Sequence, residues 1–184
     1  MPAMRVLPIW LGTVALAMLT QPGKAQPQGD EYHVKAAFLF HFAQLVDWPA
    51  EALSSGDVHL NFCTFGEDPF GGELERTVEG KLIGSRSVRV LHLTQPQDTR
   101  GCQILFLGQR ESKQAPALLE MLANTSVLTV GESDGFIHQG GMIRLSVEND
   151  RIFFEISLAV AQRAGIKMSS KLLVLAKSVI RGQE

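Results

Sequence analysis

The 184-residue sequence lacks the motifs by which common enzyme classes are recognised. It has no HExxH pattern, no GxSxG around a serine, no GxGxxG and no Walker lysine. Its histidines stand at positions without helical or metal-ligand spacing: His33, His41, His59, His92 and His138. No nucleophile and base fall together in the sequence. We therefore expect a protein that is not an enzyme, without catalytic, cofactor or metal sites.

Neither sign of charge dominates the chain. It carries 17 Lys and Arg against 19 Asp and Glu, a formal net charge of −2. No basic run is dense enough for a nucleic-acid interface or for an anionic membrane surface. The composition therefore indicates no nucleic-acid partner.

The sequence also lacks an apolar run long enough to span a bilayer, which takes about 20 residues. The longest candidate, 6–19, is interrupted by Pro8, Gly12 and Thr13. It follows a short positive segment and precedes Gly23-Lys24-Ala25, which has the small residues of a cleavage site. We predict a secretory signal peptide over 1–25 and a short polar tether over 26–30. An uncleaved N-terminal anchor is the alternative.

Cysteine is scarce, and the chain has only Cys63 and Cys102. In the cytosol such a pair would be two buried thiols. In an oxidising compartment, the simplest state of two cysteines in one domain is a disulfide. Closing that loop would stabilise the fold by roughly 4 kcal/mol. No histidine lies at ligand spacing from either cysteine, so a zinc site is not indicated.

One segment is apolar on nearly every face: a helix predicted from Glu31 to Asp47 and ended by Trp48-Pro49. Such a helix must be buried, either in its own domain or against a partner. We expect Phe38, Phe42 and Trp48 to contribute to a dimer or partner surface. The alternative is that all three are core residues.

Strands and helices alternate along the rest of the chain. Strands are predicted over 58–65, 87–93, 102–107 and 127–130, with helices over 70–79 and 113–123. A β-hairpin follows, with strands over 142–147 and 152–156, and then helices over 157–164 and 169–181. The predicted fold is a single α/β domain over 31–184. It has a mixed, mostly parallel sheet of about six strands with flanking helices, and the hairpin lies towards its C-terminus.

Two glycine-containing loops deserve separate interpretations. The loop 66–72 follows the first strand, where α/β sheets often bind ligands, but Glu67 and Asp68 would repel a phosphate, so a turn is favoured. The loop 131–142 is a turn that leads into the hairpin. It is also a candidate to present Phe136, Ile137 and His138 to a ligand or partner.

Four separated blocks of sequence resemble the YfiR-like family. They are YxVKAAFLxxFAxxVxWP over 32–49, the Cys63 strand with Gly66 and Pro69-Phe70, residues 129–143 with their glycines, and residues 164–176. The resemblance implies a periplasmic, often dimeric regulator without enzymatic activity. It would bind and repress the periplasmic domain of a transmembrane diguanylate cyclase, thereby controlling cyclic-di-GMP and biofilm formation.

The resemblance has limits that bear on regulation and on the partner. Cys63 and Cys102 match the family's bridge between strands, whereas the second cysteine pair that some relatives carry near the hairpin is missing here. Redox control through two bridges is therefore not expected. The alternative function is a periplasmic small-ligand receptor that feeds another membrane sensor.

Overall fold

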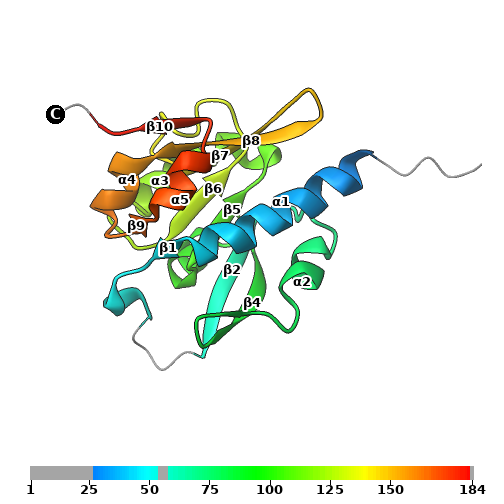
Figure 1. The fold of residues 1–184 in the computed structure, drawn as a ribbon, viewed down its shortest axis with the longest axis horizontal. Helices are drawn as coiled ribbons and strands as arrows, with labels where there is room; N and C mark the ends of the chain where they lie inside the picture. The colour runs from blue at the N-terminus through cyan, green and yellow to red at the C-terminus, as the bar shows by residue number, and fades with distance from the viewer. Residues whose placement is uncertain (1–26, 54–57, 183–184) are drawn as a thin grey trace, which may run out of the picture.

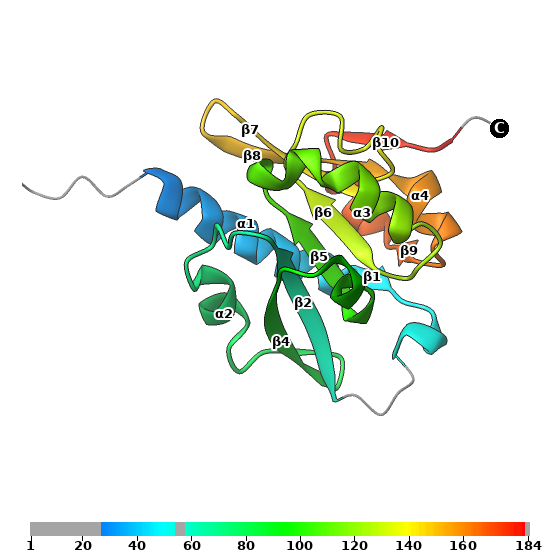
Figure 2. The same ribbon diagram turned by 180° about the vertical axis from the view of Figure 1, so that it is seen from behind.

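The computed structural model describes residues 27–53 and 58–182, so the predicted signal peptide lies outside the described residues. An eight-stranded sheet with helices on both faces forms the body of the domain (Figures 1 and 2). Its elements are α1 (Pro27–Gln44), β1 (Val46–Asp47), β2 (His59–Phe65), α2 (Glu73–Val78), β3 (Leu82–Ile83), β4 (Arg86–Leu93), β5 (Ile104–Leu107), α3 (Ala115–Met121), β6 (Leu128–Gly131), β7 (Ile143–Glu148), β8 (Arg151–Ser157), α4 (Leu158–Arg163), β9 (Lys167–Met168), α5 (Ser170–Leu175) and β10 (Ser178–Ile180).

The strand order is β10-β8-β7-β6-β5-β2-β4-β3. The strands from β4 to β7 are parallel, and their order is that of a flavodoxin-like sheet, in which the order of the strands reverses between β2 and β5. Every residue of β5 and β6 is buried, because both faces of these central strands are covered. The predicted α/β class and mostly parallel sheet are confirmed.

Two separate clusters of buried side chains form the core, one on each face of the sheet. One includes residues of α1, α2, α4 and α5 and the hairpin face that carries Leu145 and Phe154. The other lies under α3 and contains both cysteines. The chain therefore places its first and last helices on the same face of the sheet.

The predicted hairpin is present as β7 and β8. Glu148 pairs with Arg151, and the two residues between them, Asn149 and Asp150, have φ angles of 50° and 58°. Two consecutive left-handed residues make the two-residue turn whose twist suits adjacent antiparallel strands. The turn therefore projects from the sheet as a tight tip beside α1.

The sheet has eight strands rather than the predicted six, because the short strands β3 and β10 form its two edges. β3 pairs with β4, and β10 pairs in parallel with β8. Segments of two or three residues carry no recognisable period. The prediction of a helix over 169–181 is wrong for the same reason: α5 ends at Leu175, and Ser178–Ile180 extends the sheet instead.

The first helix is displaced towards the N-terminus relative to its prediction. It begins at Pro27, so Pro27–Asp30 is helical rather than a tether, as the tolerance for proline in a first helical turn allows. It ends at Gln44 instead of Asp47. Val46 and Asp47 pair with Met168 and Lys167 as the small β1–β9 sheet, which offers the backbone hydrogen bonds that the helix would have supplied.

Candidate functional site

Three of the six candidate surface residues are in the core. Phe42, Phe136 and Ile137 are buried, which corrects the expectation that they face a partner. The ring of Phe42 packs edge-on against Phe154 with centroids 5.1 Å apart. The apolar pattern of the helix indicated that Phe42 is buried. It could not show that the sheet of the same domain, rather than a partner, covers this side chain.

Phe136 fills a space that two glycines leave open. A Cβ added at Gly131 or at Gly141 would lie 2.4 Å or 2.2 Å from its ring. The glycines of the 131–142 loop therefore serve close packing around this ring. Of that loop's candidates only His138 is exposed, while Trp48 is half-buried against the core beneath α1.

The two cysteines form a disulfide with a Cα–Cα distance of 5.9 Å. Cys63 lies in β2, and Cys102 lies just before the neighbouring strand β5. Both are buried in the core cluster under α3. Because a thiolate must reach the sulfur that it attacks, this burial makes the bridge a structural crosslink.

The carboxyl ends of β2, β5 and β6 meet at the reversal of strand order, where doubly wound sheets usually bind ligands. In this protein α1 covers that edge with a charged network. Lys35 is 4% exposed, and its ammonium group contacts the carboxylates of Glu31 and Glu132. It also lies 4.5 Å from the centroid of the Tyr32 ring. The usual position for a ligand's charge is therefore occupied by a side chain.

Tyr32 and Glu132 complete this network. The Tyr32 hydroxyl donates to Glu132 Oε2 at 3.2 Å, and the same oxygen accepts the backbone N–H of Gln109 at 3.0 Å. Burial and the adjacent Glu132 carboxylate raise the pKa of Tyr32. The phenol therefore stays protonated and remains a donor. The network joins α1 to the loops that follow β5 and β6.

A second buried carboxylate, that of Glu111, lies at the same edge of the sheet. Glu111 is buried, and a Cβ at Gly66 would lie 2.3 Å from its Oε1, so only glycine admits it. The backbone N–H of Glu67 donates to this oxygen at 3.2 Å. A cavity of about 400 Å³ remains between Tyr32, Arg110 and the loop after β2. Three of its eight lining residues are acidic, Glu67, Asp68 and Glu111, and Arg110 pairs with Glu67.

Sequence reasoning missed this network. Glu31 and Lys35 have the i, i+4 spacing of a helical ion pair, which is a local signal. Glu132, however, is 97 positions from Lys35, and nothing in the sequence alone joins them.

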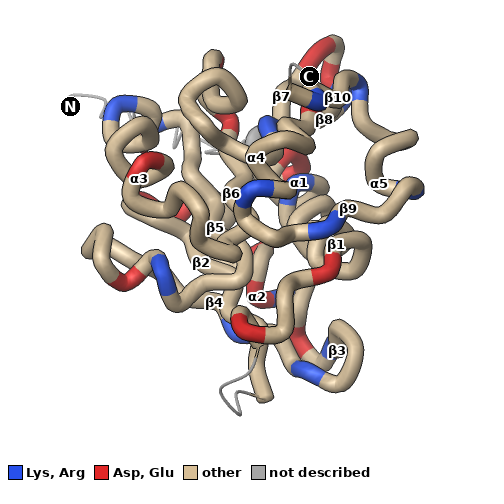
Figure 3. Tube along the Cα trace, turned by 90° about the vertical axis from the view of Figure 1, so that its left-hand side faces the viewer, with Lys and Arg blue, Asp and Glu red and all other residues tan. Residues whose placement is uncertain are grey.

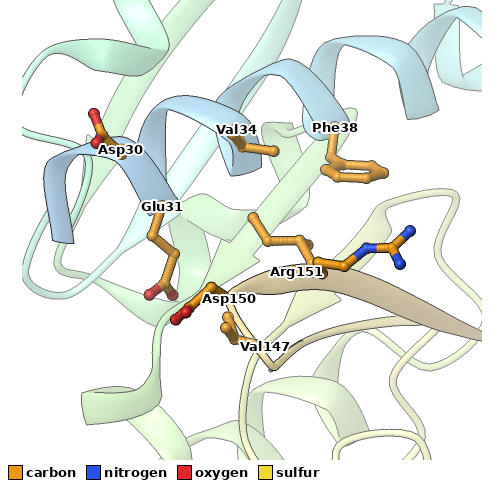
Figure 4. A pocket seen from close by; sticks show the side chains of 8 residues that line it. Asp30, Glu31, Val34, Phe38, Val147, Asp150 and Arg151 are labelled. Atoms are coloured by element: carbon orange, nitrogen blue, oxygen red, sulfur yellow. The ribbon is translucent and has the colours of Figure 1, made fainter. Parts of the chain in front are cut away.

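A larger cavity lies elsewhere, between the N-terminal half of α1 and the β7–β8 hairpin. This α1–hairpin groove has a volume of about 840 Å³. Its lining residues are Asp30, Glu31, Val34, Phe38, Val147, Asp150, Arg151 and Ile152 (Figure 4). Phe38 is thus the one predicted surface residue that borders it.

The groove has an apolar floor because the core reaches the surface there. Phe38 packs against Phe154 at 5.7 Å between centroids, and Val147 and Ile152 continue the same hairpin face beyond α1. Val34 and Val147 remain 42% and 44% exposed. The apolar floor between α1 and the β7–β8 hairpin is therefore partly open to solvent.

The charges around the groove are unevenly placed. The carboxylates of Glu31 and Asp150 lie close together at one end, with Asp30 on the same part of α1 (Figure 4). The Arg151 guanidinium extends towards the Phe38 end (Figure 4). Within the described part of the chain, Asp30 and Asp150 form no ion pair. The remaining surface has both signs interspersed (Figure 3).

The sequence matches the family described as YfiR/HmsC-like over residues 32–177, most of the chain. The protein belongs to the YfiR/HmsC-like family. Members of this family are periplasmic regulators of diguanylate cyclase signalling rather than enzymes. The matched residues include most of α1, from Tyr32 onward, and both cysteines. The comparison with curated proteins found no match.

Solved structures resemble this YfiR/HmsC-like chain in fold alone. A conserved domain protein from Vibrio cholerae has a TM-score of 0.51 and 6% identity, over 80% of this chain and 60% of that one. An ABC domain in complex with L-Trp from Streptococcus pneumonia has a TM-score of 0.49 and 9% identity, over 71% and 58%. This chain thus spans about 60% of the length of either structure.

None of the helices within residues 27–53 and 58–182 combines the length and the apolar character that crossing a membrane requires. No group of three or more His, Cys, Asp or Glu side chains in these ranges has an arrangement suited to a metal ion.

Proposed function

We propose that the protein binds the periplasmic domain of a transmembrane diguanylate cyclase and holds that enzyme in its inactive state. Cyclic-di-GMP and biofilm formation would then be limited from outside the cytoplasmic membrane. The observation that carries the proposal is the family match over residues 32–177. Export by the predicted signal peptide, with the mature chain beginning at Gln26, is part of it.

Repression of this kind needs a large contact and no chemistry. Moving a cyclase from mostly active to mostly inactive takes about 5.5 kcal/mol of preference for the inactive state. Contacts of that strength have apolar centres with polar rims. The α1–hairpin groove supports the proposal because it combines exposed apolar side chains with a charged rim.

Deleting the gene tests the proposal in the cell. We expect cellular cyclic-di-GMP and biofilm mass to rise, and both to fall again when the gene is restored. With purified protein, residues 26–184 should bind the cyclase's periplasmic domain in calorimetry. Unchanged cyclic-di-GMP together with no binding would contradict the proposal. Light scattering on the same sample tests the homodimer that the family resemblance implies.

A second candidate is a periplasmic small-ligand receptor, which the cavity of about 400 Å³ beside Tyr32 favours. Three acidic residues in its lining against the single Arg110 would favour a small cationic compound over an anionic one. A thermal-shift screen of periplasmic metabolites tests this candidate. A rise in the unfolding temperature that Glu67→Gln abolishes would support it.

A further inference from the structure

We propose that the α1–hairpin groove binds an apolar helix of the partner, one that carries a lysine or arginine beside its apolar side chains. This inference rests on the proposed function and specifies which surface serves it. Helices commonly dock in apolar grooves through side chains spaced at i, i+3, i+4 and i+7.

The first argument is the shape of the apolar floor. Val34 and Phe38 are four residues apart, so they form a ridge along one side of α1. Val147 and Ile152 pair across the hairpin and form the hairpin side of the floor. A helix laid along the floor would cover the exposed parts of Val34 and Val147 together. A globular surface without a helix or ridge would leave the floor uncovered.

The second argument concerns the extent of the groove. Its volume of about 840 Å³ would accommodate a drug-sized ligand. Small ligands, however, are usually enclosed over most of their surface, whereas this groove has walls from only α1 and the hairpin (Figure 4). An elongated occupant that continues beyond both ends fits this form better than a compact molecule.

The third argument is charge. The rim has the carboxylates of Asp30, Glu31 and Asp150 against the single guanidinium of Arg151. Glu31 also pairs with Lys35, which leaves Asp30 and Asp150 without an ion pair in the described residues. Complementarity then requires a cation on the occupant near this end, and an acidic helix would be repelled.

Three variants of the mature chain, residues 26–184, test the proposal against the purified periplasmic domain of the cyclase. Val147→Asp places a charge on the apolar floor. Asp30→Asn/Asp150→Asn removes charge from the rim, and asparagine tolerates the left-handed backbone at position 150. The matched control is Val174→Asp, on an α5 residue that is 83% exposed and does not line the groove.

We expect Val147→Asp to weaken binding by about 30-fold or more, as loss of a central apolar contact does. The Asn pair should weaken binding by about 3- to 10-fold at low salt and reduce its salt dependence. Val174→Asp should bind like the wild type. Circular dichroism and melting curves check the folding of each variant. If Val147→Asp is unfolded, Val34→Ser replaces it as the test of the floor.

The outcomes separate this inference from the proposed function. If the wild type binds and the floor and rim variants bind equally well, the groove is not the site and the inference is overturned. If removing the rim carboxylates strengthens binding, a cationic occupant is ruled out. If the wild type itself does not bind the cyclase domain, the proposed function fails, and the inference fails with it.

Discussion

Two sides of the N-terminal half of α1 differ in how they use charge. At the carboxyl ends of the parallel strands, the buried side chains of Lys35 and Glu132 pair with each other, and the half-buried Tyr32 donates to Glu132. In the α1–hairpin groove, Asp30 and Asp150 have no ion pair in the described residues, and Val34 and Val147 remain exposed. In the first region the charged groups are paired within the chain, whereas in the second the apolar side chains and carboxylates remain free to contact a partner.

The difference indicates a division of roles between stability and recognition. The reversal of strand order is the common ligand site of flavodoxin-like sheets, yet here it anchors the first helix. Adding a hairpin beyond β6 creates a second apolar face that α1 covers only in part. A fold can therefore keep its sheet order and relocate its binding surface, and only the site's own side chains reveal this.

The largest expected effect comes from disrupting the buried network of Lys35, Glu132 and Tyr32. Lys35→Met should lower the free energy of unfolding by about 3–5 kcal/mol, because it leaves the buried Glu132 carboxylate without its cation. Urea denaturation measures the change. The double variant Lys35→Met/Glu132→Gln should recover a large part of the loss. If Lys35→Met alone unfolds at the wild-type urea midpoint, the network does not anchor α1.

Removing the disulfide between β2 and the segment just before β5 should have the next largest effect. Cys63→Ala/Cys102→Ala should lower the free energy of unfolding by about 2–5 kcal/mol. Mass spectrometry of exported wild-type protein without reductant should find no free thiol. Free thiols in that sample, or an unchanged midpoint in the variant, would contradict a structural disulfide.

A smaller, pH-dependent effect is expected where α1 meets α2. Hydrogen bonds from Arg76 and, next, from His33 hold the pKa of the Glu73 carboxyl below its ordinary value. A lowered folded-state pKa stabilises the fold above the unfolded pKa, and this contribution is lost as the pH falls through the folded pKa. Glu73→Gln should therefore be less stable than the wild type at pH 7.

The same difference should vanish in acid, once Glu73 is protonated in both states. Denaturation of the wild type and of Glu73→Gln at pH 7 and again well below pH 4.5 measures it. The matched control is Glu120→Gln on the exposed side of α3. A difference that persists unchanged in acid would show that the charge of Glu73 is not its cause.

The smallest expected effect is in the groove. Val34→Ser and Val147→Ser should each change the free energy of unfolding by less than about 0.5 kcal/mol, because both side chains are already substantially exposed. Thermal denaturation measures this. A loss of several kcal/mol would mean that the groove is part of the stabilising core, and the contrast between the two regions would disappear.

Much of the fold could be predicted from local patterns, and the exceptions have physical causes. The apolar runs of β5 and β6 and the hairpin around Asn149 and Asp150 carry their signals within a few residues. β10 does not, because Ser178–Ile180 becomes a strand only through pairing with β8. In this segment, the backbone hydrogen bonds to β8 outweigh the local preference for a helix.

The candidate site could be predicted only in part. The sequence predicted that the helix carrying Phe38 and Phe42 is buried, either in its own domain or against a partner. It could not show that the hairpin covers Phe42 completely and Phe38 incompletely. That distinction depends on where β7 and β8 end relative to α1, which is a property of the tertiary structure.

The small β1–β9 sheet has a consequence for the order of folding. Val46 pairs with Met168, and Ser169 donates a backbone hydrogen bond to Leu45, so the end of the first helix is fixed by one of the last segments of the chain. Contacts between such distant segments slow folding, because the intervening chain must be ordered first. The end of α1 therefore gains these contacts only once residues 167–169 are in place. Until then, its apolar surface depends on protection from other molecules.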